Sequence, residues 1–166
     1  MDITPQVSDS RAALEELLGT TEAAAANWTT PRALKKWSPA QVAEHVARVF
    51  DDAANMLEGK PHGFPKMPFF VRPIFRMVFF AKTVRSGNFP TAKTFRPFDP
   101  VEGPDTPAAA RDRLTAAHDR YLAACSACAQ KDGKVLSSVF GAVPVTDYMR
   151  FTTLHTRHHL KQIPTA

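Results

Sequence analysis

Residues 37–45 read Trp37-Ser38-Pro39-Ala40-Gln41-Val42-Ala43-Glu44-His45, and this stretch contains the signals of a helix start. The serine can cap the first turn and the proline suits the first helical position. The glutamine, three residues after the serine, stands where a capping box requires it. Gly59 and Pro61 are stop signals, so the sequence predicts a helix that runs to about Glu58.

Similar signals predict three more long helices on either side of this one. The first covers residues 8–27, which begin with residues that favour N-caps and continue with apolar residues three and four apart. Thr106 and Pro107 repeat the cap-then-proline start of a helix that runs to about Gln130. The last helix begins near Thr146 and continues to about Ile163. We find no alternating run that requires a sheet, so the fold class is all-α, an antiparallel four-helix bundle.

The stretch between the second and third long helices is less regular, because seven prolines interrupt residues 61–100. We expect one additional short helix over residues 68–84, begun or kinked at Pro73, and then a long loop over residues 88–104. The apolar run 67–80 admits three interpretations: a core helix, a dimer surface, or an interfacial segment whose basic residues face anionic lipid. Core or dimer packing is preferred.

Length and composition place limits on the class of protein. A chain of 166 residues fits a single domain, residues 1–166, and no apolar run approaches the roughly 20 residues of a membrane-spanning helix. The chain has two cysteines and no recognisable signal peptide, so we expect a cytoplasmic protein without membrane contact. Cys125 and Cys128 lie within a helical pattern and are interpreted as small core residues rather than half of a zinc or redox site.

The net charge of +5 is concentrated in the middle of the chain. No acidic residue occurs between Gly59 and Phe98, whereas this stretch contains eight basic residues: Lys60, Lys66, Arg72, Arg76, Lys82, Arg85, Lys93 and Arg96. An anionic partner or substrate is therefore expected to meet this part. No nucleic-acid recognition motif accompanies the charge, so nucleic acid is not an expected partner.

Four histidines on two of the predicted helices form a candidate metal site. Residues four apart stand on one face of a helix, about 5–6 Å apart at Cβ, and His155 and His159 have this spacing. His155 and His158, three apart, can also pair, so the spacing leaves both choices open. His45 lies in the second helix on a half-apolar stripe that can face the core. Three inward imidazoles from two helices can therefore meet.

A trio of imidazoles suits zinc, nickel or another borderline divalent ion, and an open coordination position would let the ion activate a water molecule or a thiol. Asp52 lies two turns after His45 on the same stripe and is a candidate for accepting a proton; a solvated carboxylate at the end of the bundle is the alternative. His62 and His118 are interpreted as ordinary surface or hydrogen-bonded histidines.

The stretch 37–45, followed far downstream by His155-Thr-Arg-His158-His159-Leu-Lys-Gln162, resembles the DinB-like (YfiT-like) superfamily. Within it the chain is similar to a branch of unknown function whose last helix reads H-x-x-H-H-L-x-Q after a Phe-Gly loop like Phe140-Gly141. The resemblance implies a four-helix bundle, often dimeric, with a metal ion held by His45, His155 and His159. It gives His158 a neighbouring role. Tyr148 stands where the branch usually has tryptophan.

Some members of this group are transferases or isomerases that use small thiol cosubstrates. Our first hypothesis is therefore a metal-dependent transferase or hydrolase that acts on a small molecule, with a small thiol as cosubstrate for transfer, and that forms a homodimer. The second hypothesis is a non-enzymatic binding or stress-related protein with a structural or vestigial metal site.

Overall fold

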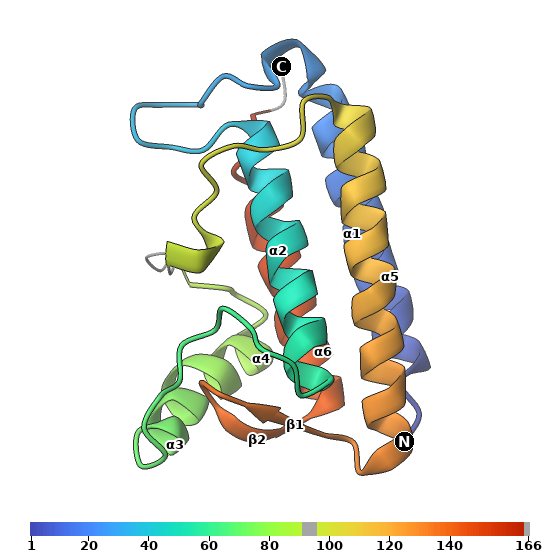
Figure 1. Cartoon of the computed structure of the whole chain (residues 1–166), viewed down its shortest axis with the longest axis vertical. Helices are drawn as coiled ribbons and strands as arrows, with labels where there is room; N and C mark the ends of the chain where they lie inside the picture. Colours follow the sequence, from blue (N-terminus) through green and yellow to red (C-terminus); the bar gives the residue numbers. More distant parts are fainter. Residues whose placement is uncertain (91–95, 165–166) are drawn as a thin grey trace.

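The computed structural model describes residues 1–90 and 96–164, and four long helices dominate it (Figure 1). They are α1 (Thr4–Ala23), α2 (Pro39–Leu57), α5 (Pro107–Lys131) and α6 (Val145–Leu160). They lie side by side along the long axis of the molecule, α2 packing along α5 and α1 along α6. Their apolar faces enclose one cluster of buried residues that includes Leu17, Phe50, Leu114 and Met149.

The start of α2 follows the predicted capping box. The Ser38 hydroxyl accepts a hydrogen bond from the Gln41 amide at 3.3 Å, and the Gln41 side-chain oxygen accepts one from the Ser38 amide at 3.0 Å. The Gln41 side-chain nitrogen also donates to the carbonyls of Pro100 and Val101, both at 3.1 Å. The same residue therefore caps the helix and fixes the loop that crosses over its start.

Helix α1 begins four residues before its predicted start. The Asp2 carboxylate accepts a hydrogen bond from the Thr4 amide at 2.9 Å, and Pro5 occupies the first turn, where its missing N–H costs nothing. The residues that we expected to cap the helix lie inside it. One of them, Ser10, is buried and bonds to His118 of α5 at 2.9 Å.

The expectation of no sheet is wrong, because residues 134–144 form a small antiparallel hairpin (Figure 1). Strand β1 (Lys134–Ser137) pairs with β2 (Gly141–Pro144), and Ser137 stands opposite Gly141. Burial alternates along β1, but the apolar and polar residues do not follow this alternation. The apolar Leu136 is exposed and the polar Ser137 is buried. The Ser137 hydroxyl accepts hydrogen bonds from the amides of Val139 and Phe140, which explains a buried serine without an alternating pattern.

The predicted short helix is a chain of three helical pieces: α3 (Arg72–Phe75), the π-helical η2 (Arg76–Ala81) and α4 (Lys82–Ser86). The described residues also form two 3₁₀ turns, η1 (Ala25–Asn27) and η3 (Arg96–Phe98). Part of the predicted loop over residues 88–104 lies outside the described residues, and so does Lys93. Among the helices that the structure describes, none is both long enough and apolar enough to cross a membrane.

Only part of residues 67–80 packs into the core of the chain, and the dimer packing of the exposed side stays a prediction. Phe80 is buried and Phe79 is half-buried, but Phe69, Phe70 and Met77 are each more than half exposed. A helical segment has one face towards the body of the protein, so consecutive apolar residues cannot all turn inward.

Candidate metal centre

Three imidazoles meet between α2 and α6. The Nε2 atom of His155 lies 3.3 Å from Nε2 of His45 and 3.0 Å from Nε2 of His159. One ligand atom from each of the three residues lies within 4.8 Å of the others, which is close enough for a single ion. Two nitrogens that each lie 2.0–2.1 Å from one zinc ion, at a tetrahedral angle, are about 3.3 Å apart. The spacing of the three nitrogens therefore fits a shared ion.

Hydrogen bonds on the far side of two rings fix which nitrogen faces the centre. The Nδ1 of His45 lies 2.7 Å from the carbonyl oxygen of Phe98, and the Nδ1 of His159 lies 3.0 Å from the side-chain oxygen of Gln162. Both partners are acceptors, so each Nδ1 carries the proton and each Nε2 presents a lone pair. His155 has one Nε2 and can donate to only one of the two rings at a time. The three Nε2 atoms therefore share at most one proton, and the remaining Nε2 lone pairs can coordinate a cation.

Burial keeps these imidazoles neutral, the form that binds metal. It lowers the pKa of His45 to about 4, an effect that the Phe98 carbonyl opposes only in part. The pKa values of His155 and His159 lie well below the usual range, first because of burial and then because the neighbouring histidines would repel a second charge. The Nδ1 of His155 is buried and has no hydrogen-bond partner among the described residues.

The rotation of α6 about its axis is fixed from the opposite face. Arg157 points away from the trio and pairs with two carboxylates of α1, Asp9 at 2.8 Å and Glu16 at 3.2 Å. The same orientation turns His158 towards the end of the helix, where its Nε2 accepts a hydrogen bond from the Gln162 side chain at 3.0 Å. Gln162 therefore links His158 to His159, and His158 lies next to the trio rather than in it.

The trio lies in a cavity of about 940 Å³. Its apolar walls are mostly phenylalanine: Phe64, Phe75, Phe79, Phe89, Phe98, Phe140 and Phe151. Basic residues from the loop before α2 and from the end of α6 also line it: Arg32, Lys35, Lys36 and Lys161. Asp99 is the one acidic residue among the described residues that line the cavity, and its carboxylate accepts a hydrogen bond from the Trp37 indole at 3.1 Å.

The sequence profile of the DinB superfamily matches residues 6–163, which is nearly the whole chain. The chain belongs to the DinB superfamily. A comparison with curated proteins finds no match, and neither does a comparison with solved structures. The largely helical fold with one small sheet is consistent with this DinB assignment, and the match covers every element that contributes a residue to the trio.

Two contributors to this DinB site were not anticipated from the sequence. The Trp37 ring lies over the trio, 4.7 Å from the His45 ring and 6.0 Å from the His159 ring. Phe98 contributes its backbone carbonyl from η3, in the irregular stretch between α4 and α5. Trp37 could have been found from its position just before the cap of the helix that carries His45. Phe98 had no such signal, because any residue can supply a carbonyl.

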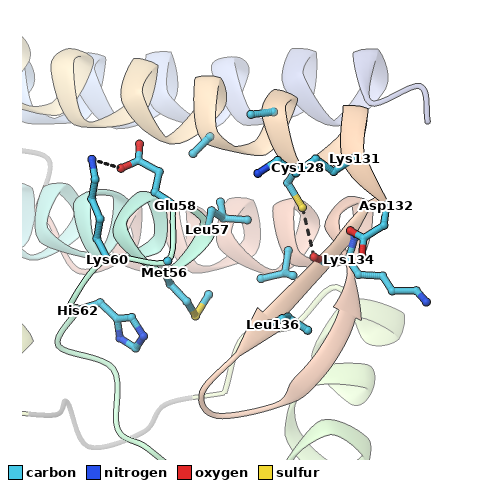
Figure 2. Close-up of a pocket in the computed structure, with 14 residues that line it drawn as sticks. Met56, Leu57, Glu58, Lys60, His62, Cys128, Lys131, Asp132, Lys134 and Leu136 are labelled. Atoms are coloured by element: carbon cyan, nitrogen blue, oxygen red, sulfur yellow. Dashed lines mark hydrogen bonds and ion pairs between the residues drawn. The ribbon is translucent and has the colours of Figure 1, made fainter.

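Asp52, His62 and the two cysteines lie apart from the trio. Asp52 does not line the cavity and its carboxylate lies against Gly63. Figure 2 shows His62 and Cys128 at a second cavity of about 670 Å³, where the Cys128 thiol donates to the Lys134 carbonyl at 3.4 Å. Cys125 is buried, and burial raises the pKa of its thiol to about 12. Neither cysteine carries the lowered pKa of a reactive thiol.

Proposed function

We propose that this DinB protein is a metal-dependent transferase or hydrolase that acts on a small molecule. The observation that carries the proposal is the convergence of three neutral imidazole nitrogens inside an apolar cavity. We further propose zinc or nickel as the ion, His45, His155 and His159 as its ligands, and a small thiol as cosubstrate for transfer reactions. A four-helix bundle, a homodimer and a cytoplasmic location belong to the same proposal.

A divalent ion in this position would act as a Lewis acid towards a water molecule, a thiol or a carbonyl oxygen. The residues of the chain prepare the place for it. The Phe98 carbonyl and the Gln162 side chain hold two imidazoles in the tautomer that offers Nε2 to the centre. Trp37 packs over His45 and His159 on one side, and Phe89 contacts His155 at 5.0 Å on another. These rings limit access of bulk water to the nitrogens.

The cavity also indicates the chemistry of the substrate. Phenylalanine side chains dominate its walls, so they favour an apolar or aromatic body. The side chains of Arg32 and Lys161 stand close enough to His158 to lower its pKa further after burial, which places positive charge near the trio. None of the four basic lining residues forms an ion pair with another described residue. We therefore expect a substrate with an anionic group attached to an apolar body.

The activity test compares wild type with His155→Ala in two assays: conjugation of a small thiol to an electrophilic aromatic acid, and hydrolysis of an aryl ester that carries a carboxylate. Both are run on zinc-loaded and nickel-loaded protein. His62→Ala is the matched control, because His62 lies at the other cavity. The proposal predicts activity in wild type and the control and its loss in His155→Ala. Equal rates in all three proteins would exclude the enzyme for these reactions and favour the non-enzymatic alternative.

A further inference from the structure

One group of large apolar side chains is left in solvent beside the hairpin. Phe69, Phe70, Ile74, Met77 and Val78 are each more than half exposed, and we call these five residues the apolar ridge. Three of them, at positions 74, 77 and 78, have the spacing of one helical face. Scattered exposed apolar residues are ordinary, but five within ten residues form a patch of the kind that marks an interaction surface.

The ridge is the outer face of a segment whose inner face is firmly packed. On the inner face, the Phe80 ring lies 5.0 Å from Phe140 and 5.1 Å from Phe151, and Phe79 lies 5.8 Å from Phe151. The Arg72 side chain donates to the Met67 carbonyl at 2.8 Å, which ties the start of the segment to the turn before it. The segment lies at the periphery of the molecule as α3 and α4 (Figure 1). The ridge is thus held in a fixed, outward orientation.

Four basic residues precede, interrupt or follow the ridge in the sequence, and we call them the basic border. Two of them, Arg76 and Arg85, donate hydrogen bonds to backbone carbonyls, but none meets a carboxylate of the described residues. Lys66, Arg76, Lys82 and Arg85 are exposed, and no acidic residue occurs between positions 59 and 98. Among the described residues, none of these four forms an ion pair. Their charge remains available to an external anion.

We propose that the apolar ridge and its basic border dock on the surface of an anionic lipid bilayer. Phenylalanine and aliphatic side chains can enter the boundary between headgroups and acyl chains while lysine and arginine meet the anionic headgroups. The helical segment from Arg72 to Ser86 is too short to span a bilayer, which fits a segment that lies on the surface. The docking does not depend on the metal centre.

Charge favours lipid over a second copy of the chain. In a two-fold symmetric dimer through this face, the same patch of both copies would meet, so basic residues of one copy would lie near those of the other. The segment offers no acidic residue to pair with them. Like charges across an interface oppose association. An anionic bilayer instead complements the border and covers the apolar side chains with the same contact.

The test is co-sedimentation of the full chain with vesicles of phosphatidylcholine alone and with vesicles of an equimolar mixture with phosphatidylglycerol. We expect binding to the mixed vesicles only, weakened by high salt. The double variant Phe69→Ser/Phe70→Ser is expected to bind at least about tenfold more weakly, because two large apolar groups are removed. The double variant Lys66→Gln/Lys82→Gln is expected to lose about fivefold for each charge removed.

Matched controls remove the same chemistry elsewhere on the surface. Leu34→Ser/Val101→Ser replaces two exposed apolar residues, and Arg11→Gln/Lys131→Gln replaces two exposed basic residues, all outside the ridge and the hairpin. Both controls are expected to bind mixed vesicles as wild type does. Thermal melts establish that each variant is folded, which is expected because every substituted side chain is exposed.

Three results would overturn the proposal. The first is no binding to mixed vesicles, and the second is equal binding to both kinds of vesicle. The third is a dimer in sedimentation velocity that Phe69→Ser/Phe70→Ser dissociates while vesicles bind nothing, which would assign the ridge to a second copy.

Discussion

Gln162 tests whether a hydrogen bond orients His159 for metal binding, because the oxygen and the nitrogen of its side chain bond to different histidines. Its oxygen accepts from Nδ1 of His159 at 3.0 Å and its nitrogen donates to His158 at 3.0 Å. Gln162→Leu removes both interactions, whereas Gln162→Glu keeps an acceptor for His159 and removes the donor to His158. If the oxygen fixes the tautomer of His159, the two variants must behave differently.

The expected change in metal affinity follows from the hydrogen bond between Gln162 and Nδ1 of His159. Loss of an orienting partner of a metal-bound histidine lowers affinity by about 10–100-fold, which corresponds to about 1.4–2.7 kcal/mol. Gln162→Leu is expected to fall in this range, and Gln162→Glu to match or exceed wild type because a carboxylate is the stronger acceptor. Without metal, Gln162→Leu loses two hydrogen bonds, which costs about 2 kcal/mol and lowers the melting temperature by about 4–8 °C.

The assay is competition between the protein and a chromophoric chelator for zinc, at fixed pH, for wild type and both variants. Gln130→Leu is the matched control, because this glutamine is exposed at the end of α5. The reasoning is refuted if both Gln162 variants bind zinc as wild type does, or if the glutamate variant loses as much affinity as the leucine variant.

Three further predictions concern the scaffold. Burial lowers the pKa of His118 to about 4 from an ordinary 6.5, so the unfolded chain binds this proton more tightly and stability falls as pH drops from 6.5 towards 4, by about 3 kcal/mol in total. His118→Gln cannot take up the proton, and denaturant titrations across this pH range should show a shallower loss; an unchanged slope would contradict the assignment. A Cβ at Gly103 would overlap the Ala40 carbonyl, so Gly103→Ala should lower the free energy of unfolding by about 1–3 kcal/mol. A Cβ at Gly19, within α1, would meet open space, so Gly19→Ala should raise it by about 0.5–1 kcal/mol. Thermal melts that rank the two variants the other way would be inconsistent with this packing. Ser38→Ala removes the cap of α2 and should lower the stability of the protein by about 1 kcal/mol in the same melts. An unchanged melting temperature would mean that the capping box contributes nothing to stability.

Local signals in the sequence predicted the helix starts well wherever the cap is a side chain followed by proline. The starts of α2 and α5 follow Ser38 and Thr106 as expected, and the Thr106 hydroxyl accepts from the Ala109 amide at 3.1 Å. The start of α1 was misplaced because Ile3 occupies the cap position without a side-chain hydrogen bond. The carboxylate of Asp2, one residue earlier, accepts the hydrogen bond from the first turn instead. Equally good capping residues at 8–10 were a false signal.

Features that depend on tertiary contacts could not be predicted in the same way. The hairpin was missed because its strands contain four residues each and its inward positions include Ser137. Which residues of 67–80 turn outward could not be predicted, because composition shows how apolar a segment is, not which side chains find partners. That information depends on where Phe140 and Phe151 lie, and both are distant in the sequence.

The candidate site was predictable in part. Helical spacing brought His155 and either His158 or His159 to one face, and the resemblance to the DinB-like group favoured His159. In the structure His159 faces His155 and His45, whereas His158 bonds to Gln162. Spacing could not make this distinction, because it depends on the rotation of α6 that Arg157 fixes through Asp9 and Glu16 on another helix.

The most direct test of the central claim is a calorimetric titration of zinc into metal-stripped protein. The account predicts one ion per chain in wild type and in His62→Ala, and loss of most of the affinity in His45→Ala and in His159→Ala. Circular dichroism establishes that the variants remain folded. The claim would be contradicted by wild-type protein that binds no stoichiometric ion, or by His45→Ala and His159→Ala variants that bind zinc as tightly as wild type.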